Sequence, residues 1–454
     1  MSQTFTLNKK EFNKKLLRLA IPIAIQGVIS ATLNMVDTFM VGLLGETELA
    51  AVGVGAQLFM IHFMINFGII GGTATFVAQF YGTGDKGNIR KGIGLAGSMI
   101  FAIGLLFFFG TMFFGKEILS FYSKDPAVVE LATRYVRTCA PSFLMIAISN
   151  PLSMGFKTTQ QSKVPMIVST IVFFTNIFFN YILIFGKLGM PRLGVVGAAL
   201  GTLIARGFEI VAMVGFAFGK KNYFRGPLGS YFGWSKEFVI RVIKNAAPTT
   251  CNEFLWGLGQ TMYVAAFNRI GTAAFAAFEA SHSIANVFSF AAFSVGDAAL
   301  IFTGQKLGEG RKEETCEISK YLIKIGIVVG IICGALIALT AKPISGIFKL
   351  SPEGKSYMVL ILMVIALMEP LGLYNGMQIT GFLRGGGDTR FAMLAESGTV
   401  WLVAVPMAFA AALIWHVPIH IAVLLTRMED VVKFFILTKR FLSKKWMNNM
   451  ITGL

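Results

Sequence analysis

The chain has 454 residues, of which 55% are hydrophobic and only 14% are charged, and its mean hydropathy is +0.69. Ordinary soluble domains carry about a quarter charged residues, so this composition excludes a typical soluble domain and indicates a membrane protein. The formal net charge of +17 would favour a nucleic-acid partner in a soluble protein, but in a membrane protein it indicates basic cytoplasmic loops, and we expect no nucleic acid.

Apolar segments long enough to cross a membrane recur along the whole chain. A bilayer core of about 30 Å needs about 20 apolar residues per helix. On this measure the first half contains spans near residues 17–43, 49–80, 92–114, 129–153, 164–186 and 194–219. The second half contains spans near residues 240–268, 273–303, 320–341, 355–380, 391–413 and 419–441. The sequence therefore predicts an all-α polytopic membrane protein with twelve transmembrane helices.

The loop charges predict an orientation for these spans. With both termini placed inside, the inner segments hold 26 Lys and Arg residues and the outer loops hold 10. Basic residues concentrate in cytoplasmic loops, so this asymmetry predicts a multi-pass protein of the cell membrane with both termini in the cytoplasm.

The two halves of the chain are related by a shift of 226 residues. The shift keeps one register over the first two spans and aligns, among others, Pro22 with Pro248, Gln79 with Gln305, and Gly82 with Gly308. Six spans per half predict a parallel repeat, in which two six-helix lobes are related by a pseudo-two-fold axis along the membrane normal and enclose a substrate path. We expect an N-terminal lobe over residues 1–218, a cytoplasmic linker over 219–244 and a C-terminal lobe over 245–454.

Asp37 is the one charged residue between Leu19 and Leu44. An ionisable group inside a span costs about 3 kcal/mol or more, which favours a functional role over a local hydrogen bond that only kinks or packs the helix. Because burial disfavours the charged carboxylate, a proton or a bound Na⁺ would neutralise it. Asp37 is therefore the candidate ion-responsive group.

Three neutral polar residues lie at a similar depth in the first half. Asn176 and Asn180 are four residues apart and share one helix face. Counting about 1.5 Å per residue places them, with Thr202 and Asp37, in the outer half of the membrane. Amides also pack helices together, and a Thr in a span often bonds its own backbone. At matching depth, however, the four side chains predict an all-oxygen cation site.

The second half has acids of its own at Glu253, Glu279, Asp297, Glu369 and Glu396. Glu253 and Glu279 are the deepest, and their position is equally consistent with cavity lining and with structural ion pairs. The predicted substrate cavity consists of Glu253, Glu279, Trp256, Gln26 and Asn34.

The remaining candidates have simpler interpretations. Pro22 predicts a helix kink that could also serve as a hinge. The four histidines, His62, His282, His416 and His420, show no ligand spacing and are interpreted as structural. The four cysteines show no paired spacing, so neither a disulfide framework nor a metal site is predicted.

Four stretches together resemble signatures of the multidrug and toxic compound extrusion (MATE) exporters. They are LAIPIAIQGVISATLNMVDTFMVGLLGETELAAVGVG, GFKTTQQSKVPM, NIFFNYILIFGKLGMPRLGVVGAALGT and GFLRGGGDTR. The resemblance runs from about residue 12 to residue 440. It implies two six-helix lobes, alternating access, and export of bulky organic cations against inward movement of protons or sodium.

The resemblance also implies roles for single residues. The membrane acid of the family falls on Asp37, and its first-lobe partners fall on Asn176, Asn180 and Thr202. Some members have Asp at the place of Asn180, so this site carries one negative charge fewer than theirs. Other members bind the cation with a Glu in span seven, about one turn from the place of Glu253. Asp388, in the last motif, is interpreted as a cytoplasmic turn or helix cap rather than a ligand.

These observations predict a secondary active antiporter without a cofactor, which uses H⁺ or Na⁺ as its coupling ion. Its expected partners are small organic cations and membrane lipids, and it is expected to be a monomer. The alternative is a flippase for a lipid or lipid-linked saccharide, which should line its path with Arg and Lys, whereas the deep charges here are mostly acidic. Zinc-protease, paired-carboxylate and nucleotide-binding motifs are absent from the sequence, so we do not expect an enzyme.

Overall fold

The computed structural model describes residues 8–219 and 222–454, and within 290–292 only the backbone. Residues 1–7, in the predicted N-terminal lobe, and 220–221, in the predicted linker, lie outside this description. The first half contains α1 (Lys9–Gly42), α2 (Glu46–Thr83), α3 (Lys86–Ser120), α4 (Pro126–Cys139), α5 (Ser142–Thr158), α6 (Lys163–Phe185) and α7 (Val195–Ala217). A short 3₁₀ helix, η1 (Leu228–Tyr231), precedes the second half.

The second half begins with α8 (Lys236–Phe267), inside the range expected as linker. It continues with α9 (Thr272–Gly308), α10 (Lys312–Ile347) and α11 (Pro352–Gly376), which runs on into the π-helical turn η2 (Met377–Leu383). The next span is assembled from α12 (Thr389–Thr399), η3 (Val400–Ala404), α13 (Val405–Phe409) and η4 (Ala410–Ile414), and α14 (Ile419–Leu442) follows.

The prediction of an all-α protein with twelve spans is confirmed. Within the described residues, nine helices are long and apolar enough to cross a membrane, and α4 with α5, bent by 48°, make a tenth span. The other two are α8 and α14, which have 32 and 24 residues. Both carry polar and charged side chains, such as Glu253 and Lys433, that lower their hydropathy.

The internal repeat is visible in the helix boundaries. α2, α3, α4 and α6 begin at residues 46, 86, 126 and 163, and α9, α10, α11 and α12 begin at residues 272, 312, 352 and 389. Each of these starts is displaced by the 226 residues that the sequence alignment predicts. The two halves therefore fold as two copies of one helical plan.

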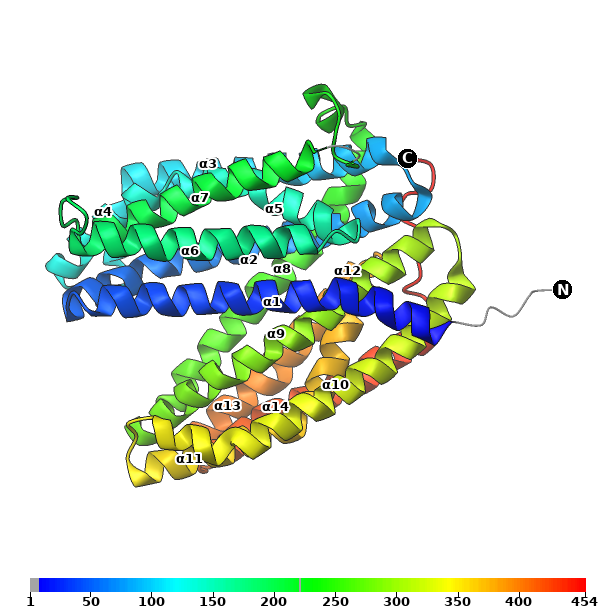
Figure 1. Cartoon of the computed structure of the whole chain (residues 1–454). Coiled ribbons are helices and arrows are strands. Elements are labelled where there is room, and N and C mark those ends of the chain that lie inside the picture. The colour runs from blue at the N-terminus through cyan, green and yellow to red at the C-terminus, as the bar shows by residue number, and fades with distance from the viewer. Residues whose placement is uncertain (1–7, 220–221) are drawn as a thin grey trace.

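Figure 1 shows the two halves as separate layers of helices that converge at one end and diverge toward the other. We call the converging end, which carries the start of α1 and the ends of α2, α9 and α14, the closed end. The largest apolar core contains residues from both halves, including Phe80 of α2, Phe302 of α9 and Phe382 of η2. The smaller cores each lie within one half. Burial of apolar surface between the halves therefore concentrates at the closed end.

Glycines allow α2 and α9 to touch at the closed end. A Cβ atom added to Gly82 would lie 2.1 Å from the carbonyl oxygen of Gln305. A Cβ atom added to Gly308 would lie 2.1 Å from the carbonyl oxygen of Gln79. The contact is reciprocal because the four residues are two repeat-related pairs. Only glycine permits so close an approach of the two backbones.

Candidate functional site

The four predicted residues of the first lobe lie together between α1, α6 and α7. Asn180 Nδ2 donates to Asp37 Oδ1 at 2.7 Å and to Asn176 Oδ1 at 2.9 Å. Asn176 Nδ2 donates to Thr202 Oγ1 at 3.4 Å. A single chain of hydrogen bonds thus joins the carboxylate, the two amides and the hydroxyl.

Local packing explains why these side chains meet. Asn176 and Asn180 are one helical turn apart on α6 and point to the same side. A cluster of Met40, Val41, Ile184 and Ala198 holds α1 against α6 and α7 close to the site. On α7, Gly201 makes room for the amide, since a Cβ atom at this position would lie 2.1 Å from Asn180 Oδ1.

The site contains an unpartnered buried oxygen. Asn176 is 1% exposed and Asn180 is fully buried, whereas Asp37 is half-buried. Asn180 Oδ1 has no hydrogen-bond partner among the described residues. Leaving a buried acceptor unsatisfied costs about 1–3 kcal/mol. A cation, which needs oxygen ligands, would recover this cost.

Asp37 forms no ion pair with any residue that the structure describes. Arg206 lies four residues beyond Thr202 on α7, and its Nη1 atom is 2.6 Å from Glu209 Oε2. The hydrogen-bond donor to Asp37 is a neutral amide. Asp37 therefore has a neutral amide as its partner, and Arg206 is paired with Glu209 rather than with Asp37.

In the second lobe, by contrast, three acids have cations of the chain itself as partners. Arg384 Nη2 is 2.5 Å from Glu253 Oε1 and Lys433 Nζ is 3.2 Å from Glu429 Oε1. Arg427 Nη1 is 3.5 Å from Asp430 Oδ2. For Glu253, the structure shows the ion pair that the sequence left as one of two interpretations.

The other second-lobe acids are more varied. Glu396 accepts a hydrogen bond from Asn252 Nδ2 at 2.5 Å. Asp297 lies 4.0 Å from Lys157 of the first lobe. Glu369 is half-buried and Glu279 is exposed.

The second lobe also contains polar residues that the sequence analysis did not select. Asn375 Nδ2 donates to the carbonyl oxygen of Asp430 at 2.8 Å and to its Oδ1 at 3.2 Å. Asp430, Glu429 and Lys433 are all buried in α14. Their spacing of three and four residues along one span is the signal that could have identified intrahelical pairing.

The remaining candidates are distributed along α1 and α8. Pro22 is buried within a continuous α1, and it does not end the helix. Asn34 is exposed, and Gln26 is half-buried with its Oε1 atom buried and unpartnered. Trp256, on α8 of the second lobe, packs against the apolar core of that lobe. The structure does not bring Trp256 into the Asp37 cluster.

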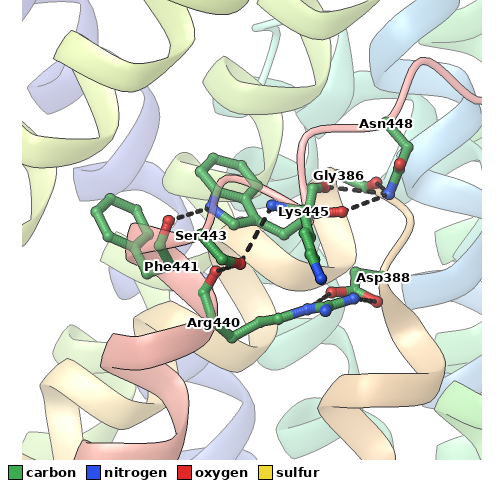
Figure 2. A network of polar contacts seen from close by, with 8 residues as sticks. Gly386, Asp388, Arg440, Phe441, Ser443, Lys445 and Asn448 are labelled. Atoms are coloured by element: carbon green, nitrogen blue, oxygen red, sulfur yellow. Dashed lines mark hydrogen bonds and ion pairs between the residues drawn. The ribbon is translucent and has the colours of Figure 1, made fainter.

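Asp388 lies in the turn before α12, as the sequence predicts, but its side chain makes no cap hydrogen bond. Instead its two carboxylate oxygens accept from Arg440 of α14, at 2.6 Å and 3.0 Å (Figure 2). This bidentate pair ties the turn to the end of the last span.

Comparison with known proteins gives a consistent family assignment. The MatE family model matches residues 22–182 and 246–410, once in each half. "Probable multidrug resistance protein NorM" of Pasteurella multocida is 25% identical over 421 residues, covering 88% of this chain and 86% of that protein. The protein of the same name from Thermotoga maritima is 25% identical over 407 residues, covering 88% and 85%.

Solved structures share the fold. One described as the "outward-facing conformation of a multidrug resistance MATE family transporter of the MOP superfamily" matches with a TM-score of 0.86 at 21% identity, over 95% of this chain and 96% of that one. A MOP superfamily transporter from Pyrococcus furiosus, for which "reverse polarity of binding pocket" is said to suggest a different function, matches with a TM-score of 0.85 at 21% identity, over the same shares.

Proposed function

The chain belongs to the MATE family of membrane transporters and is not an enzyme, and we propose that it is a secondary active antiporter. In this proposal it exports organic cations in exchange for inward H⁺ or Na⁺, and Asp37 is the ion-responsive carboxylate. The observation that carries the proposal is the hydrogen-bonded cluster of Asp37, Asn180, Asn176 and Thr202 with its unpartnered amide oxygen.

The composition of the cluster suits either coupling ion. Asp37 contributes a carboxylate, and Asn180 Oδ1 is already buried and free to coordinate. Na⁺ is a hard cation that binds oxygen ligands, and a proton on Asp37 would remove the same charge. Binding of either ion favours one conformation only if the inward-facing and outward-facing states bind it differently. The cluster joins α1 to α6 and α7, so movement of α1 about Pro22 would change its geometry.

The observed arrangement of the lobes supports the assignment of this structure to one state of the transport cycle. With both termini in the cytoplasm, as the loop charges predict, the closed end lies on the cytoplasmic side. The lobes then diverge toward the outside (Figure 1). We assign this structure to the outward-facing state, from which a substrate is released and a coupling ion enters.

Charge and the names of the relatives support a substrate class. The two relatives from P. multocida and T. maritima have names that record multidrug resistance. The deep cations Arg206, Arg384 and Lys433 are each paired with an acid, so they do not present free positive charge to an anion. This supports an organic cation as substrate over the anionic lipid that a flippase would carry.

Purified protein in liposomes that contain a fluorescent organic cation tests this function. A pH gradient and a sodium gradient are imposed separately, and cation movement is followed in each case. Movement that follows one of the gradients supports the exporter and identifies its ion. Absence of movement under both gradients, with folded protein, contradicts it, and movement of a labelled lipid in the same vesicles would support the flippase.

A further inference from the structure

The segment that follows α14 crosses from the second lobe to the first at the closed end. In Figure 1 it is the red trace that leaves the end of α14 and runs up to the opposite layer of helices. Its first part is anchored on the second lobe. Trp446 is fully buried, and its ring stacks on Phe441 with a centroid distance of 5.6 Å. Asn448 donates from its backbone nitrogen and from Nδ2 to the carbonyl oxygen of Gly386, at 3.2 Å and 3.0 Å (Figure 2).

The following residues bind the first lobe through Gln79 of α2, which is fully buried. The backbone nitrogen of Met450 donates to Gln79 Oε1 at 2.7 Å. Gln79 Nε2 donates to the carbonyl oxygen of Asn448 at 3.1 Å. The segment thus satisfies both ends of one buried side-chain amide.

The same residues also contact two second-lobe helices at this interface, α8 near its start and α9 at its end. Arg241 Nη1 of α8 donates to the carbonyl oxygen of Thr452 at 2.7 Å. Asn449 Nδ2 donates to the carbonyl oxygen of Leu307, on α9, at 3.0 Å. Residues 448–454 therefore connect α2 of one lobe with α8, α9 and the η2–α12 turn of the other.

The internal repeat shows what this segment replaces. Gln305 of α9 is the repeat partner of Gln79, and it also has partners at both ends of its amide. Its Nε2 donates to the carbonyl oxygen of Thr158 at 2.9 Å, and its Oε1 accepts from Gln160 Nε2 at 2.7 Å. All of these contacts cross between the lobes.

The residue equivalent to Gln160 under the shift of 226 is Gly386. It has no side chain that could reach Gln79. A Cβ atom on Gly386 would lie 1.9 Å from the carbonyl oxygen of Trp446, so the segment after α14 occupies the space that a side chain would take. In one repeat both ends of the glutamine amide are bound by a turn. In the other, Gln79 Nε2 also reaches the carbonyl oxygen of Gly385 in the equivalent turn at 3.4 Å, but its Oε1 is bound by this segment.

We propose that residues 448–454 are a latch that stabilises the closed end and must release Gln79 whenever the lobes separate there. The role of the latch in transport rests on the proposed alternating-access function. Its effect on the distance between the lobes does not depend on that function. A protein without the latch should spend more time with the lobes apart at this end. The segment makes two hydrogen bonds to Gln79, and their loss should raise the open-to-closed ratio about tenfold.

Spin labels on the two lobes measure this ratio without substrate, ion gradient or transport. The labelled positions are Lys163→Cys at the start of α6 and Glu313→Cys at the start of α10, both exposed. The four native cysteines are replaced in this background. Two variants disturb the latch: removal of residues 448–454, which leaves Trp446 and the Asp388–Arg440 pair in place, and Gln79→Met. Gln57→Met, an exposed glutamine on the same helix, is the matched control.

The expected result is a longer inter-label distance in both latch variants, with the control like the wild type and thermal unfolding midpoints that show folded protein. A wild-type distance distribution after removal of residues 448–454 would overturn the latch, even if Gln79→Met shifts it. So would an equal shift in Gln57→Met. Because the readout is a distance, these outcomes are independent of whether the protein exports organic cations.

Discussion

The amide oxygen of Asn180 lies against Gly201, at the position where a larger residue would place its side chain. This contact fixes the amide so that its nitrogen faces Asp37 and its oxygen stays unpartnered. The geometry of the candidate ion site therefore depends on a residue that is not itself a ligand.

The first prediction concerns Gly201→Ala. The added methyl group must displace Asn180, so we expect the apparent affinity for the coupling ion to fall about tenfold, equivalent to about 1.4 kcal/mol. The measurement is transport rate against ion concentration in liposomes. Gly207→Ala on the same helix is the control, since its Cβ would meet only Met145 Cε at 3.8 Å. Equal ion dependence in both variants would show that Gly201 does not position the amide.

A second prediction concerns the charge of the site. Asn180→Asp places a second carboxylate beside Asp37, and added ligand charge strengthens binding of a hard cation. We expect tighter sodium binding, about tenfold, as measured by calorimetry on the purified protein. The corresponding change at an exposed position, Asn268→Asp, should leave it unaltered. Unchanged sodium affinity in Asn180→Asp would remove Asn180 from the site.

A third prediction tests the ion pairs of the second lobe. Lys433 and Glu429 are both buried, so Lys433→Met leaves an uncompensated carboxylate and should lower the free energy of unfolding by about 3–5 kcal/mol. Replacing both residues, with Glu429→Leu added, should restore most of this loss. Thermal unfolding in detergent compares the wild type, Lys433→Met and the double variant. If Lys433→Met alone is as stable as the wild type, the pair does not neutralise this part of the lobe.

A fourth prediction uses the crossing of α2 and α9. Gly82→Ala and Gly308→Ala each push a methyl group into the backbone of the opposite lobe, so both should favour separation at the closed end. The label pair at positions 163 and 313 measures the effect. Gly53→Ala is the control on α2, because a Cβ atom there meets nothing within 4 Å. Because the two glycines are repeat-related, an effect of only one of them would contradict a symmetric contact.

The sequence predicted the first-lobe cluster because depth can be counted along a helix of fixed rise. Asp37, Asn180 and Thr202 stand out in apolar runs, and residues at equal depth on neighbouring helices can meet. The repeat shift of 226 could also be found in the sequence. The glycines and glutamines that it aligns make backbone contacts between the lobes, and few other residue types could replace them there.

Other features depend on tertiary contacts that no local pattern reveals. The polar residues of α14 pair with each other and with Asn375 of α11, which compensates their charges. A hydropathy scale does not include this pairing, so it overestimates the cost of placing these residues in a membrane. The segment after α14 has no helical or strand periodicity. Its position follows from the space above Gly386 and from the buried amide of Gln79, which become apparent only when the two lobes are assembled.

The central claim is that Asp37 couples ion entry to export. The most direct test measures ion flux and organic-cation flux together in liposomes that contain either the wild type or Asp37→Asn, with Glu130→Gln, an exposed acid of α4, as control. We predict that the wild type and the control accumulate the cation against its gradient while the ion flows down its own, and that Asp37→Asn loses this accumulation. Gradient-driven accumulation by Asp37→Asn at the wild-type rate would contradict the account.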